Sequence, residues 1–206
     1  MKLKYVVNIQ IVVLGESARP DLEDDMAYAY ASTVSKGTQT KASLGHDLAA
    51  GALAGQVAGL IMAVVMMAVF TVFLGKGPLF PVQVIGSFVF GEPAVHGFHP
   101  GALVAGLLLH QLGPSLVWGL VLGAVVYATN VRGGTGLLAI GAATGLASQI
   151  IDVNVLVPAA MHALHGQNFW AENVPAFWSW AAHLVFGLSL ASFTWSSRRL
   201  APRSAR

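Results

Sequence analysis

Between residues 48 and 197 the chain has only five charged side chains: Lys76, Glu92, Arg132, Asp152 and Glu172. Hydrophobic residues make up 55% of the whole chain and charged residues only 10%, whereas a soluble domain has about 25% charged residues. Such a long stretch with so few charges is typical of a protein whose solvent is lipid.

Four apolar segments are long enough to cross a bilayer, because a spanning helix needs about 20 mainly apolar residues. They are residues 48–74, 101–128, 135–157 and 174–195. Backbone groups in lipid must be hydrogen-bonded within the segment, so these segments should be helices. Pro114 is expected to kink the second helix without ending it, because the apolar run continues on both sides of it.

Residues 79–90 form a fifth apolar segment that is too short to span. The sequence therefore predicts an all-α integral membrane protein. Its fold class is a four-transmembrane-helix bundle with a short N-terminal extension and an interfacial or re-entrant segment in the first outer loop.

The basic residues predict the orientation, because cytoplasmic loops of membrane proteins are enriched in lysine and arginine. Five basic residues precede residue 48, Arg132 lies in the loop 129–134, and the tail 196–206 contains four arginines. The outer loops 75–100 and 158–173 contain only Lys76. We therefore expect a multi-pass protein of a bacterial-type cytoplasmic (inner) membrane, with both termini in the cytoplasm.

Residues 1–47 are expected to form a cytoplasmic extension, with one strand over Tyr5–Leu14 followed by a polar linker. A cleaved secretory signal is the alternative, but Asn8 and Gln10 interrupt the apolar run and no small-x-small cleavage site follows it. A lone strand cannot bury its faces in water. This stretch therefore suggests a partner protein.

Small residues recur at four-residue spacing on all four predicted helices. Membrane helices associate by close backbone approach at such positions. The glycines are Gly51, Gly55, Gly59, Gly119, Gly123, Gly141, Gly145 and Gly187. They predict close packing inside the bundle, or, for the first three, docking against another subunit.

Three ionisable residues fall inside the predicted spans: His110, Asp152 and His183. At about 1.5 Å per residue, both histidines should lie roughly 10 to 14 Å deep in the outer half of the bilayer. Ser148 and Asp152 form a polar membrane stripe on the third helix. Because charge is costly at this depth, these side chains should face the bundle interior or a partner.

Three interpretations of the histidines remain open. His110 and His183 could be axial ligands of haem b. The outer-loop histidines could bind copper or zinc with Glu92 and Glu172; they are His96, His99, His162 and His165. In the third interpretation there is no cofactor, and the membrane histidines form hydrogen bonds between helices.

No nucleotide-binding loop, serine elbow or paired-carboxylate motif is present, so we do not expect an enzyme. The chain has no cysteine and no continuous basic stripe for nucleic acid. The favoured prediction is a small non-catalytic accessory or structural subunit of a larger membrane complex, of respiratory or photosynthetic electron-transfer type. A small permease or channel for protons, metal ions or a small solute is the alternative.

Overall fold

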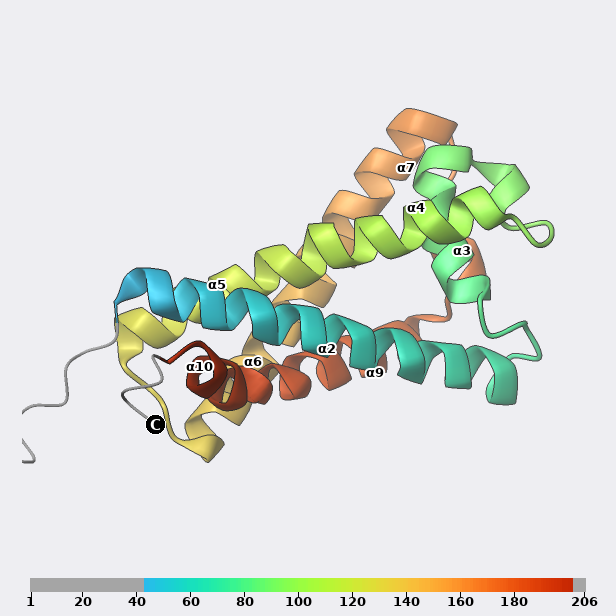
Figure 1. Cartoon of the computed structure of the whole chain (residues 1–206). Helices are drawn as coiled ribbons and strands as arrows, with labels where there is room; N and C mark the ends of the chain where they lie inside the picture. Colours follow the sequence, from blue (N-terminus) through green and yellow to red (C-terminus); the bar gives the residue numbers. More distant parts are fainter. Residues whose placement is uncertain (1–42, 202–206) are drawn as a thin grey trace, which may run out of the picture. The chain divides into compact units, whose positions relative to one another are not determined.

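The computed structural model describes residues 43–201, and this part of the chain is helical without strands (Figure 1). Residues 1–42 and 202–206 are outside the described residues. The predicted Tyr5–Leu14 strand, most of its linker and the last five residues of the basic tail therefore lie there as well, whereas residues 44–47, predicted to be linker, already belong to the first helix.

Four helices are long and apolar enough to cross a membrane, as a multi-pass membrane protein requires: Leu44–Phe73, Pro100–Thr129, Gly134–His165 and Ala176–Leu200. A fifth apolar helix, α3 (Phe80–Phe90), has only 11 residues. The four long helices are below called the first to the fourth span, in chain order.

The first span is the unbroken helix α2 (Leu44–Phe73), whereas the other three consist of shorter helices in series. These are α4 (Pro100–His110), α5 (Leu116–Thr129), α6 (Gly134–Ser148), α7 (Val157–His165), α9 (Ala176–Ser189) and α10 (Phe193–Leu200). A short helix, α8 (Phe169–Asn173), precedes the fourth span.

Capping side chains explain where several helices begin. Ser43 Oγ accepts a hydrogen bond from His46 N at the start of α2, and Asn168 Oδ1 accepts one from Ala171 N at the start of α8. Pro100 occupies the first position of α4, where its missing N–H costs nothing. Asn130 ends α5 in the left-handed conformation that asparagine tolerates.

The third span is longer than the sequence predicted. It runs to His165 instead of residue 157. Pro158 does not end the helix because it lies in the first turn of α7, directly after a π-helical segment in which its missing N–H is accommodated. The fourth span also continues further, through Arg198 and Arg199 to Leu200, so that part of the predicted tail is helical.

Helix α2 lies at the centre of the bundle and contacts α5, α9 and α10 (Figure 1). The contact with α5 is a backbone contact. A Cβ atom on Gly51 would overlap Gly119 O, and one on Gly123 would overlap Asp47 O. These residues are glycine because no side chain fits between the two helices.

The third and fourth spans meet in the same way. A Cβ on Gly145 would overlap His183 O, and one on Gly141 would overlap Gly187 O. Beyond Ser148 the third span changes its neighbours, since α6 packs on α9 whereas α7 contacts α3 and α8. The chain therefore diverges from the fourth span in its second half, as Figure 1 shows for α7.

Two π-helical segments interrupt the spans, which we call the first break (Gln111–Ser115) and the second break (Gln149–Leu156). The first break contains Pro114 and a non-helical Gly113. It lies within a helix that continues on both sides, as predicted. Single π turns within α-helices are frequent at functional sites.

Polar contacts join three elements at the end of the bundle where α2 begins. The fully buried carboxylate of Asp47 accepts hydrogen bonds from Arg132 Nη1 at 3.0 Å and Nη2 at 2.7 Å. A further hydrogen bond of 2.9 Å joins His46 Nε2 and Ser197 Oγ of α10. The bonds with Asp47 raise the pKa of Arg132, which lies in the loop between the second and third spans.

Candidate functional site

A cavity of about 450 Å³ lies where the two breaks face each other. All four spans and α3 contribute to its lining, which is mainly apolar and includes Met62, Val82 and Phe186. Because both breaks border it, the cavity occupies the region where regular helix packing is interrupted.

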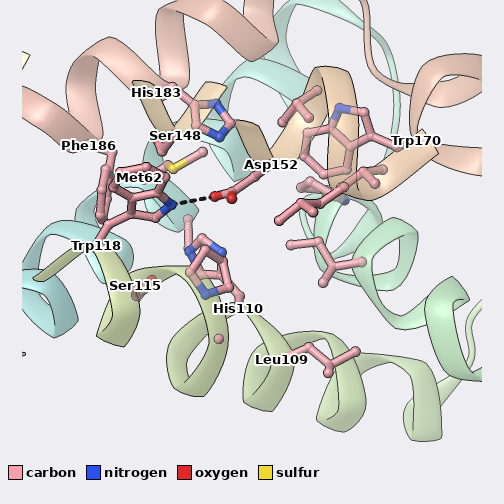
Figure 2. A pocket seen from close by; sticks show the side chains of 18 of the residues that line it. Met62, Leu109, His110, Ser115, Trp118, Ser148, Asp152, Trp170, His183 and Phe186 are labelled. Atoms are coloured by element: carbon pink, nitrogen blue, oxygen red, sulfur yellow. Dashed lines mark hydrogen bonds between the residues drawn. The ribbon is translucent and has the colours of Figure 1, made fainter. Parts of the chain in front are cut away.

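Polar side chains from the second, third and fourth spans also line this cavity. They are His110, Ser115, Trp118, Ser148, Asp152 and His183. Figure 2 shows the two histidines entering from different helices, on opposite sides of a hydrogen-bonded pair formed by Trp118 and Asp152.

This pair links the second span to the third. Trp118 Nε1 donates a hydrogen bond of 2.7 Å to Asp152 Oδ2. The other carboxylate oxygen, Oδ1, has no hydrogen bond within the described residues. Asp152 is half-buried in the second break, so one oxygen holds the two spans together and the other remains available.

His183 is buried and presents an unoccupied acceptor. Its Nδ1 lies 2.8 Å from Ser179 O, and because a carbonyl only accepts, this nitrogen must donate. In the neutral imidazole, Nε2 is then an acceptor, and it has no hydrogen-bond partner in the part of the chain that is described.

His110 is arranged in the complementary way. Its Nε2 lies 3.1 Å from Gly59 O and donates to it, which connects the second span to the first. Its Nδ1 is the acceptor of the neutral ring. The two histidines, which the sequence predicts to lie at the same depth in the bilayer, thus line one cavity. Each donates a hydrogen bond to a backbone carbonyl.

Two further polar groups at the cavity have no protein partner within residues 43–201. They are Ser115 Oγ, at the end of the first break, and Trp170 Nε1, on α8. Buried polar atoms are nearly always hydrogen-bonded. Unpaired groups at one cavity are therefore typical of a site that binds something.

Sequence reasoning missed Trp118, Ser115 and Trp170 as members of this site. The signal for Trp118 was available, because an indole N–H within an apolar span needs an acceptor. Asp152 is the only acid within the predicted spans. Pairing the two would have placed the second and third spans side by side.

Ser148 and Asp152 both line the cavity, as a stripe on one helix face should. Ser148 Oγ donates to Gly145 O at 2.8 Å, so its hydroxyl hydrogen is used within its own helix. The next residue, the buried Gln149, accepts a hydrogen bond of 2.8 Å from Ser179 Oγ and joins the third span to the fourth.

None of the four loop histidines is among the lining residues of this cavity. His96 lies on the surface, 3.1 Å from Glu92 Oε1. His99 caps α4, where its Nδ1 accepts a hydrogen bond from Ala102 N. His165 Nε2 donates to Phe88 O, and His162 is exposed on the last turn of α7.

Within residues 43–201 no group of three or more histidine, aspartate or glutamate side chains is arranged to hold a metal ion. The copper or zinc site predicted for the four loop histidines therefore has no preformed ligand group there. For haem, His183 Nε2 is free to ligate whereas His110 Nε2 is bonded to Gly59 O. Axial ligation by this pair stays a prediction.

Comparisons with protein-family models, with curated proteins and with solved structures found no match to this chain.

Proposed function

We propose that the chain is a small membrane protein of permease type that binds a small molecule in the cavity at the two breaks. One observation carries this proposal: polar groups of three spans meet at a single mainly apolar cavity. Interrupted membrane helices that present polar groups are the usual construction of transporter sites. The cavity volume of about 450 Å³ is also within the range of small-molecule sites.

The proposal includes insertion of the four spans into a cytoplasmic membrane, with the loop 129–134 on the cytoplasmic side. Arg132 supports this orientation, because it is the charged residue of that loop. The outer loops would then contain α3 and α8. Both termini are placed in the cytoplasm, and no catalytic step is part of the proposed function.

The accessory-subunit function stays a second, untested prediction. The glycines expected to dock a partner are instead in contact within the chain, where Gly55 meets Ser115 and Gly119. No contact among residues 43–201 favours that function over binding in the cavity. Gentle detergent extraction that yields a stoichiometric complex with another chain would support it.

Binding in the cavity is tested by filling it. Ala63 lines the cavity, whereas its neighbour Val64 is 65% exposed on the outer side of α2. We expect Ala63→Phe to abolish saturable binding and Val64→Phe to leave it unchanged, because only the first ring occupies the cavity. The purified full chain is titrated by calorimetry with three probes that share a phenylbutyl body and carry an ammonium, alcohol or carboxylate head.

The proposed function holds if at least one probe binds the unmodified chain and the Val64→Phe variant but not Ala63→Phe. Circular dichroism and a monodisperse elution profile confirm that both variants are folded. If none of the three probes binds the unmodified chain, or if Ala63→Phe binds as well as Val64→Phe does, the cavity is not a binding site.

A further inference from the structure

Among its described lining residues the cavity has one acidic side chain, and its basic side chains are the two histidines. Asp152 is its only aspartate or glutamate, and no lysine or arginine is among its described lining residues. The carboxylate receives one N–H, from Trp118. A charge in a surrounding of low polarity interacts strongly with an opposite charge, so an ionised Asp152 favours a cation in the cavity.

Three of the hydrogen-bonding groups at the cavity are acceptors, whereas the unpaired Trp170 Nε1 on α8 is a donor. His183 Nε2 accepts in the neutral ring because Nδ1 donates to Ser179 O. His110 Nδ1 accepts because Nε2 donates to Gly59 O. With the free oxygen of Asp152, three acceptors from three spans surround the cavity. Such a set is complementary to a ligand head with several N–H donors.

The walls of the cavity match an apolar body. Met62, Met66 and Phe186 line it beside the indole of Trp118. Aromatic faces attract cations when water is excluded. The cavity of about 450 Å³ also has room for a body much larger than a metal ion or an ammonium ion.

We infer that the cavity binds a monovalent organic cation, an alkylammonium whose N–H groups reach Asp152 and the two histidines while its apolar body lies among Met62, Phe186 and Trp118. The inference rests on the proposed function, for which it names the substrate class. It needs no metal and no other cofactor.

Phenylbutylammonium and phenylbutanol test this inference on the purified full chain, because they share one body and differ in head charge. We expect the ammonium to bind at least about 10-fold more tightly than the alcohol, a difference of about 1.4 kcal/mol. We expect phenylpentanoate, which has the same phenylbutyl body, not to bind, because its carboxylate would be repelled by that of Asp152.

Asp152→Asn removes the charge and keeps the shape and the acceptor for Trp118 Nε1. We expect it to weaken ammonium binding at least about 10-fold and to leave alcohol binding unchanged. Glu172→Gln is the matched control, since Glu172 is exposed on α8 and does not line the cavity. It should change neither affinity.

Two results would overturn the cation inference and leave the proposed function standing. One is that the alcohol or the carboxylate binds as tightly as the ammonium. The other is ammonium binding that Asp152→Asn does not alter. If the asparagine variant does not fold, the affinities of the three probes for the unmodified chain still show whether the cavity prefers a cation. Binding of no probe would refute the proposed function itself.

Discussion

Replacing Gly55 by alanine is expected to lower the free energy of unfolding by about 3 kcal/mol, as overpacking of a close contact does. A Cβ at this position would overlap Ser115 O and lie 2.8 Å from Gly119 Cα. Both are backbone atoms, so the second span as a whole must move away from the first. The measurement is the unfolding transition of the purified chain in detergent.

Gly45→Ala is the matched control on the same helix. Nothing lies within 4 Å of a Cβ at Gly45, so the helix-favouring methyl group should be neutral or stabilising by up to about 1 kcal/mol. If both alanine variants have the unfolding transition of the unmodified chain, the backbones of the first and second spans are not in contact at Gly55.

Replacing Arg132 by alanine should lower the free energy of unfolding by a similar amount. Arg132→Ala leaves the fully buried carboxylate of Asp47 without its two N–H donors. Breaking a buried ion pair on one side costs about 3 to 5 kcal/mol. Because its hydrogen bonds with Asp47 raise the pKa of Arg132 in the folded state, the stabilisation from its charge is present at every pH below its ordinary pKa.

The exposed Arg198 provides the control for this substitution, and Arg198→Ala should change the unfolding transition by less than about 0.5 kcal/mol. The double variant Asp47→Ala/Arg132→Ala should be more stable than Arg132→Ala, because no unpaired charge remains buried. An Arg132→Ala variant as stable as Arg198→Ala would show that the ion pair does not hold these elements together.

The long helices could be predicted because their cause is local. Apolar length and the scarcity of charge define each span, and the apolar sequence around Pro114 was sufficient to place a kink there. The second break was not predicted: residues 149–156 contain neither glycine nor proline, and the one local signal is Pro158, which removes a hydrogen bond to the carbonyl of residue 154. Beyond the break, α7 contacts α3, which is distant in the sequence, and the following helix α8.

The candidate site was predicted in part. Its ionisable side chains, His110, Asp152 and His183, are conspicuous in an apolar sequence. Their hydrogen-bond partners are not, because Trp118 belongs to the site only through its bond to Asp152 on another span. The loop histidines lie in two separate loops of the sequence, and within the described residues they form no group of three that could hold a metal ion, since His96, His99 and His165 each have their own contact.

The most direct measurement is the side of the membrane on which three loops lie. The chain has no cysteine, so Gly77→Cys, Gly133→Cys and Gln167→Cys each introduce a single reactive thiol. A Cβ at Gly77 or Gly133 meets nothing within 4 Å. In intact cells, a membrane-impermeant maleimide should label positions 77 and 167, whereas position 133 should be labelled only after the membrane is opened. Labelling of position 133 together with the other two in intact cells would contradict the proposed crossings, and so would a chain that is soluble without detergent.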